Sequence, residues 1–143
     1  MTMFSIFKHN SEEEQLKKKL FDFLSELEKN LEIFYVMDQR QFITHGFLMD
    51  KWPLVKDLDI IKKHETITRY VKAIEMFNGS LKAFKDFESW YTADINNKTP
   101  EGGRKLHAMK HELDEKLKTM EALIIPAGQD LEREMLQLGL LKA

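Results

Sequence analysis

The sequence predicts an all-α fold, an elongated antiparallel up-down bundle of three long helices. Apolar residues recur every three or four positions in three segments of similar length, and they nowhere sustain the alternation of a strand. The chain of 143 residues contains only 6 Gly and 3 Pro, so it has little material for turns. A helical repeat with few breaks favours long helices joined by short connections.

The first helix is expected over residues 12–51. Ser11 is a typical N-cap residue, and a glutamate three positions later completes a capping box. Gly46 is one candidate for the end of the helix, as a C-cap; the other is a continuation to about Asp50, just before a proline. The sequence leaves both open, and in either case the chain reverses between residues 46 and 56.

The second and third helices are expected over residues 54–94 and 100–141. The second has an apolar seam that keeps its phase across Gly79, which favours one continuous helix in which this glycine allows a neighbour to approach closely. The third has Thr99 as N-cap and a proline as its first residue, and Pro126 is expected to break it. Breaks at Gly46 and Pro126 raise the count to four or five helices. The alternative is a compact four-helix bundle, with 54–94 split at Gly79.

Composition places the chain among ordinary globular proteins, as one helical-bundle domain over residues 1–143. The formal net charge of -2 argues against a general grip on nucleic acid, which needs an excess of clustered Lys and Arg. The absence of Cys excludes disulfides, thiolate zinc sites and cysteine nucleophiles. No apolar run approaches the ~20 residues of a membrane span, and no signal peptide is recognisable, so we expect a cytoplasmic protein without a membrane partner.

Residues 31–53 carry apolar side chains on nearly every face of the predicted helix, which is typical of a segment buried all round. Three polar residues, Asp38, Arg40 and His45, interrupt this segment. Polar groups in such surroundings need hydrogen-bond partners. They are therefore either structural or part of a site.

The up-down arrangement predicts where those partners lie. Folding the chain about residue 52 places Asp38 level with His64 and Glu65, and folding it again about residue 97 adds Asp130 and the break at Pro126. Asp38, His64 and Glu65 are thus candidates for binding a small molecule or a metal between the helices. The alternative, which such networks more often support, is that these groups only satisfy one another.

A metal centre or another cofactor is not expected elsewhere. Carboxylate–histidine di-metal sites in helical bundles need a Glu-x-x-His motif on two helices, and no His in this chain has a Glu three residues before it. His107 and His111 have the spacing of a metal-binding pair, but they fall on the polar side of the third seam, so we interpret them as a solvated stripe.

One short motif carries a resemblance to a known family. Residues 40–47, with Arg40, four intervening residues, His45, Gly46 and Phe47, resemble the Arg-x4-His-Gly-aromatic signature of HEPN domains, all-α proteins of which many are metal-independent ribonucleases. The resemblance implies that Arg40 and His45 form a catalytic pair facing RNA across a dimer interface. The histidine would act in acid–base chemistry and the arginine on phosphate.

The sequence favours the interpretation that this is a non-catalytic helical-bundle protein that acts through protein–protein contacts, as a homo-oligomer. The chain holds 10 Phe, 8 Met and 2 Trp, more large apolar residues than three thin seams require. The candidates for the interface are Trp52, Trp90, Tyr91 and the C-terminal residues Leu138, Leu140 and Leu141. The alternatives are the HEPN-like ribonuclease with Arg40 and His45 and the binding site around Asp38 and His64.

Overall fold

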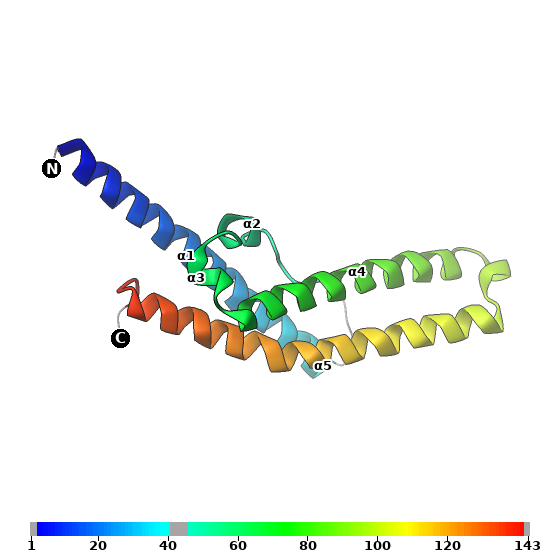
Figure 1. Cartoon of the computed structure of the whole chain (residues 1–143). Helices are drawn as coiled ribbons and strands as arrows, with labels where there is room; N and C mark the ends of the chain where they lie inside the picture. The colour runs from blue at the N-terminus through cyan, green and yellow to red at the C-terminus, as the bar shows by residue number, and fades with distance from the viewer. Residues whose placement is uncertain (1–2, 41–45, 142–143) are drawn as a thin grey trace.

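Three long helices dominate the computed structural model, which describes residues 3–40 and 46–141 (Figure 1). The long helices are α1 (Met3–Arg40), α4 (Glu65–Ala93) and α5 (Pro100–Gln137). The shorter elements are α2 (Trp52–Val55), α3 (Asp59–Lys62) and the 3-10 helix η1 (Ile95–Asn97). Within the described ranges no residue forms a strand, and the prediction of an all-α bundle built on three long helices is confirmed.

Helix α1 differs from its prediction at both ends. It begins at Met3, so Ser11 lies inside the helix and does not cap it. A serine cap contributes only about 1 kcal/mol, and no Gly or Pro between residues 3 and 11 stops the helix from continuing. The helix extends to Arg40, and residues 46–49 are not helical, so the expected continuation to Asp50 is wrong. The alternative end at Gly46 depends on residues 41–45, which lie outside the described residues.

The second predicted helix is continuous through Gly79, as expected, but it begins at Glu65 instead of residue 54. The chain before it forms α2 and α3, separated by extended backbone at Leu58 and followed by extended backbone at His64. These two short helices place Val55 and Ile61 in the core with no exposed surface. Tertiary burial of these two side chains, which local periodicity does not report, accounts for the interruption.

Helix α5 begins as predicted and passes through the predicted break. The Thr99 hydroxyl accepts a hydrogen bond from the Gly102 amide at 3.0 Å, and Pro100 is the first helical residue. Pro126 lies inside the helix, which continues to Gln137, so the prediction of a break is wrong. A proline costs a helix about 3 kcal/mol, but Ile124 and Leu131 on either side are completely buried, and each buried aliphatic side chain contributes roughly 1.5–3 kcal/mol.

The three long helices do not all alternate in direction. α4 and α5 form an antiparallel hairpin, and α1 is antiparallel to α5, but α1 and α4 run the same way (Figure 1). The connecting segment runs back along both: Leu48 bonds to Asn30 and Lys51 to Glu26 of α1, while the Phe47 ring packs on Phe77 of α4. The expected tight reversal between residues 46 and 56 is replaced by this return segment.

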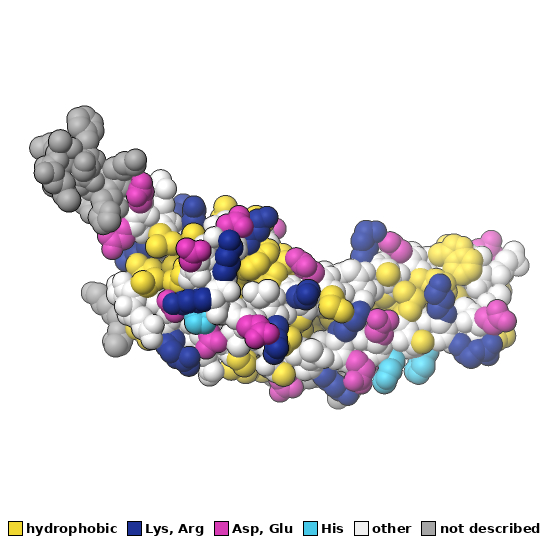
Figure 2. Space-filling model, in the orientation of Figure 1, with side chains coloured by type: hydrophobic (Ala, Val, Ile, Leu, Met, Phe, Trp, Pro, Cys, Tyr) yellow, Lys and Arg dark blue, Asp and Glu magenta, His cyan; other side chains and the backbone are white. Residues whose placement is uncertain are grey.

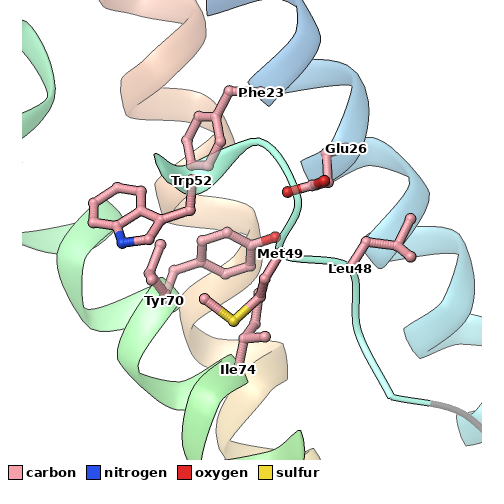
Figure 3. A pocket seen from close by; sticks show the side chains of 8 residues that line it. Phe23, Glu26, Leu48, Met49, Trp52, Tyr70 and Ile74 are labelled. Carbon is pink, nitrogen blue, oxygen red and sulfur yellow. The ribbon is translucent and has the colours of Figure 1, made fainter. Parts of the chain in front are cut away.

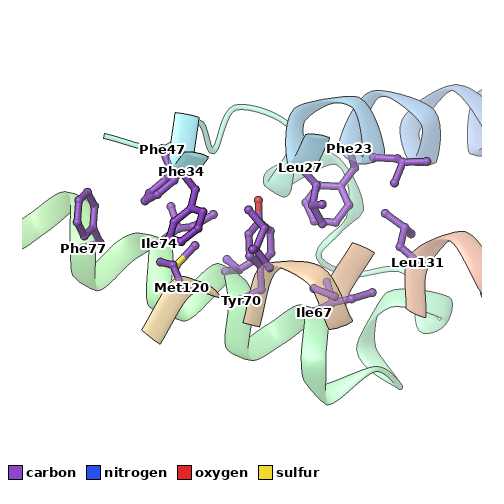
Figure 4. Packing of buried hydrophobic residues seen from close by; sticks show 14 of the residues in the cluster. Phe23, Leu27, Phe34, Phe47, Ile67, Tyr70, Ile74, Phe77, Met120 and Leu131 are labelled. Carbon is purple, nitrogen blue, oxygen red and sulfur yellow. The ribbon is translucent and has the colours of Figure 1, made fainter. Parts of the chain in front are cut away.

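One hydrophobic core lies where α1 crosses the hairpin (Figure 4). Leu27 of α1 lies beside Ile67 of α4 and Leu131 of α5, and Phe34 lies beside Ile74 and Met120. α1 packs directly on α5 at Gly128, where an added Cβ atom would lie 3.0 Å from a methyl carbon of Leu27. The Pro126–Gly128 sequence therefore marks a helix crossing.

Candidate functional site

The predicted catalytic pair lies outside the described side chains. Arg40 is the last residue of α1, and its side chain is not described; His45 falls in residues 41–45, which are not described at all. The same holds for the side chain of Asp38, although its backbone belongs to the last turn of α1. The roles suggested for these three residues stay predictions.

The expected position of Asp38, beside His64 and Glu65, is wrong. Asn30 of α1 bonds to Tyr70 of α4, 40 residues later, and Leu27 lies beside Ile67 (Figure 4). Because α1 and α4 run in the same direction, this offset places the backbone of Asp38 near residue 78 and far along α4 from His64. The sequence pattern reports which face of a helix is apolar, but it does not report the direction of the helix.

His64 and Asp130 lie within about one helical turn of the same level, close to the predicted positions, because His64 contacts Glu134 and the nearby Thr66 contacts Asp130. His64 Nε2 lies 2.9 Å from Glu134 Oε2, and Lys63 Nζ lies 2.7 Å from the other oxygen of the same carboxylate. Lys63 first, and His64 second, hold the pKa of Glu134 below its ordinary value of 4.5. Glu65 points elsewhere, to an exposed ion pair with Arg69 on its own helix.

A second polar contact extends this junction of α3, α4 and α5. The Thr66 hydroxyl donates to Asp130 Oδ2 at 2.6 Å, and Arg133 lies 3.0 Å from the other oxygen of that carboxylate. Each carboxylate at the junction is thus occupied by side chains of this chain. Among the described residues no group of three or more His, Asp or Glu is placed to hold a metal ion. The arrangement is typical of a hydrogen-bond and ion-pair network that holds helix ends together, rather than of an open binding site.

The most deeply buried polar residue among those described, Asn30, was not identified from the sequence. Asn30 has no exposed surface, and its side-chain amide bonds both the N–H and the C=O of Leu48, at 2.7 and 2.9 Å. It also donates to the Tyr70 hydroxyl at 2.8 Å, and burial raises the pKa of that hydroxyl far above its usual range. A polar residue between Leu27 and Phe34 on the apolar face of α1 was the signal that could have identified it.

Glu26 lies one turn before Asn30 and holds the same return segment. Its carboxylate is 7% exposed and accepts the Lys51 backbone N–H at 3.1 Å. Burial raises the pKa of Glu26, with Asp50 adding repulsion, while the bond from Lys51 acts in the opposite direction.

The side chains around Glu26 fill the space beneath the return segment (Figure 3). The space that Phe23, Trp52, Tyr70 and their neighbours enclose does not admit a water molecule. Asn30 and Glu26 together therefore fasten the return segment to α1. On the outer side of this contact an open hollow of about 310 Å³ is lined by Glu26, Leu48 and Lys51, among others.

The distal half of the α4–α5 hairpin has a different character, and we call residues 82–112 the arm. α1 does not reach it, and none of its residues is buried; the nearest buried residues are Leu81 and Leu113, at its base. Phe84, at the base of the arm, packs against the core, and Tyr91 lies against Gly102 and Gly103 of α5. Phe87 lies 5.6 Å from Trp90 and 6.3 Å from Tyr91 between ring centres, and Lys105 Nζ lies 4.6 Å from the centre of the Phe87 ring.

The arm continues an apolar stripe on the outside of α4, opposite its core face. The outer stripe consists of Met76, Gly79, Ala83, Phe87 and Trp90. Met76 is 57% and Trp90 52% exposed, Gly79 and Ala83 are exposed, and Phe87 is half-buried. Hydrophobic side chains are visible along this half of the molecule, between basic and acidic ones (Figure 2). Exposed apolar side chains in a row are typical of an interaction surface.

The other predicted interface residues are divided between the surface and the interior. Trp52 is half-buried against Phe23, with 5.9 Å between the ring centres. Leu140 is buried because α5 ends in a Schellman turn: Gly139 adopts a φ of 72°, and the Leu140 amide bonds back to Met135 at 2.8 Å. Trp90 and Leu138 are exposed, and Trp90 alone belongs to a continuous apolar stripe. His107 and His111 are exposed on the arm, as expected.

Comparison with known proteins adds no relative: no protein-family model matches the chain, and none of the curated proteins or solved structures compared with it matches. Over the described part of the chain, no helix combines the length and the apolar character needed to cross a membrane. Function therefore has to be argued from the surfaces of this molecule alone.

Proposed function

We propose that this chain is a non-catalytic helical-bundle protein that acts through protein–protein contacts and forms a homo-oligomer through the arm and the outer stripe of α4. The observation that carries the proposal is that residues 82–112 include no buried residue although they contain three Phe, Trp or Tyr residues around Phe87 and further apolar residues facing α5. Two helices bury only a strip along their contact, and bundles bury such residues by adding a third or fourth helix.

The charge balance of the arm supports a protein surface as the partner that binds it. The arm holds six basic residues and five acidic ones, counted over 82–112 without His. A nearly neutral surface has no field to attract nucleic acid or an acidic membrane. It does suit the apolar, weakly charged contacts of protein interfaces, in which aromatic residues are enriched.

Sedimentation equilibrium of the purified chain over a wide concentration range tests the proposal. We expect the average mass to rise above the 16.9 kDa of one chain as concentration increases. Trp90→Glu places a charge on the exposed stripe and should weaken association at least tenfold, because a buried unpaired charge opposes docking. Ser89→Glu, at the next exposed position on a different side of the helix, is the matched control and should associate normally.

Two results would overturn the proposal. One is a mass of 16.9 kDa at every concentration up to the millimolar range. The other is association that Trp90→Glu leaves unchanged while circular dichroism reports a folded protein.

A further inference from the structure

The outer stripe has the spacing of a helix–helix seam, and none of the helices that the structure describes packs on it. Met76, Ala83 and Trp90 are separated by seven residues each, with Gly79 and Phe87 between them. A seven-residue repeat with intervening positions is the pattern by which one helix packs along another. The core face of α4 uses other positions, Ile67, Tyr70, Ile74, Phe77 and Leu81. α4 therefore carries two apolar faces, and the described residues cover one of them.

Gly79 leaves a gap in the middle of this seam. A Cβ atom added there would meet nothing within 4 Å, so no described residue uses the close approach that a glycine permits. Gly79 was expected to allow a neighbour to approach closely, and the described residues supply no such neighbour. A mid-helix glycine costs about 1 kcal/mol relative to alanine, and the exposed Ala83 one turn later is also small. The stripe thus has small residues at its centre and large ones at its ends.

We propose that the outer stripes of two copies of this chain pack antiparallel, with the two-fold axis at Ala83. This inference rests on the proposed self-association and specifies its geometry. Met76 and Trp90 lie equally far from Ala83 on either side. In an antiparallel pair the Trp90 ring of each copy lies against Met76 of the other, and Phe87 fills the gap at Gly79 of the other. The same patch serves both copies, as a two-fold interface requires.

Charge favours the same arrangement. Lys72 and Asp94 are exposed and stand eleven residues from Ala83 on either side, Asp94 being the residue that follows α4. Asp94 Oδ1 accepts the Asn96 N–H at 2.9 Å, so in the antiparallel pair each Lys72 comes near the other carboxylate oxygen of the partner's Asp94. Lys82 is close to the axis, but it already pairs with Asp86 of its own helix at 2.8 Å. A parallel pair would instead oppose Lys72 to Lys72 and leave the gap at Gly79 facing another gap.

The size of the stripe sets the strength of the contact. Residues 76–90 span about 21 Å at 1.5 Å per residue, and with the neighbouring α5 the surface is roughly 20 Å wide. The contact is therefore on the order of 400 Å² per copy, about half of a standard stable interface. We expect a dimer that dissociates on dilution, with a dissociation constant in about the micromolar range.

Cross-linking of the full chain tests the axis directly, because the chain contains no Cys. Ala83→Cys places two thiols at the axis within disulfide distance when small residues bring the helices together. We expect rapid oxidation to a dimer that a reducing agent reverses. Lys85→Cys, exposed on another face of the same turn, is the matched control and should stay monomeric under the same oxidant.

Gly79→Leu is the second test, since it fills the gap without touching the rest of the monomer. We expect it to fold normally and to weaken association at least tenfold by sedimentation equilibrium. If the wild-type chain dimerises but Ala83→Cys does not cross-link faster than Lys85→Cys, or if Gly79→Leu dimerises normally, the antiparallel geometry is wrong and self-association stands. If the wild-type chain remains a monomer at every concentration, self-association itself is wrong, and this geometry with it.

Discussion

The body and the arm are built from the same two helices, and they differ in whether a third element covers them. The body comprises α1, the return segment 46–64, α4 up to Leu81 and α5 from Leu113, and it contains every buried residue of the described chain. The arm continues the apolar seams of both helices without a buried residue. An apolar seam therefore predicts a face that needs a partner, but it does not say whether the partner belongs to the same chain.

The largest expected loss of stability comes from removing a buried polar contact of the body, and it is compared with removal of an exposed polar contact of the arm. Asn30→Leu removes the partners of the Leu48 backbone and of the buried Tyr70 hydroxyl, at a side chain that has no exposed surface. We expect a loss of about 3–5 kcal/mol in the free energy of unfolding, since each unsatisfied buried group costs about 1–3 kcal/mol. Urea denaturation measures it. Asn97→Ala, which removes an exposed bond to the Trp90 carbonyl in the arm, should cost under about 1 kcal/mol, and equal losses would contradict the comparison.

Substitution of glycine by leucine should lower the stability of the protein at one position and raise it at another. Gly128→Leu introduces a side chain against Leu27 in the core and should destabilise the protein by about 1–3 kcal/mol, the usual cost of overpacking. Gly79→Leu should stabilise the monomer by about 0.5–1 kcal/mol, because leucine is the better helix former and nothing opposes it. Thermal denaturation at low protein concentration compares them. Destabilisation of similar size at both positions would mean that Gly79 is in contact with something.

Smaller effects are expected from the two buried glutamates of the body, and their pH dependences should be opposite. The pKa of Glu134 is lowered below 4.5, so its contribution to stability is complete above that pH and is lost as the pH falls through the lower value. The pKa of Glu26 is raised above 4.5, so the folded state loses stability as the pH rises from 4.5 through the higher value.

Urea denaturation between pH 3 and pH 7 separates these two contributions. Relative to the wild type, Glu134→Gln should lose more stability at pH 7 than at pH 3, whereas Glu26→Gln should improve as the pH rises. Glu88→Gln, on the exposed surface of the arm, controls for the substitution itself. A difference for Glu134→Gln that does not change with pH would contradict the ion pairs with Lys63 and His64.

The smallest expected effect on folding is that of Trp90→Ala in the arm. Trp90 is 52% exposed, and its aromatic partner Phe87 is itself only half-buried, so at low concentration we expect the free energy of unfolding to change by under about 1 kcal/mol. Differential scanning calorimetry measures the change. A loss comparable to that of a core aromatic, about 3–5 kcal/mol, would show that the arm belongs to the folding core of the monomer.

Part of the polar junction could be predicted from the sequence, and part could not. His64 and Asp130 were expected to be level because α4 and α5 are joined by a short connection, which leaves only an antiparallel hairpin. Asp38 was misplaced because its connection to α4 is long enough to return along the body, and the sequence has no signal for that return. Glu134, the partner of His64, lies 70 residues away, and its spacing to neighbouring apolar residues does not reveal it.

The sequence by itself determined the helical class, the apolar faces of the three long helices, the continuity through Gly79 and the start of α5 at Thr99 and Pro100. These features depend on residues within a turn or two of each other, where periodicity and capping are decided. Tertiary structure alone decided the common direction of α1 and α4, the passage of α5 through Pro126 and the bonds of Asn30. Each of these depends on contacts between residues far apart in the chain, whose burial outweighs the local cost of a proline or a buried amide.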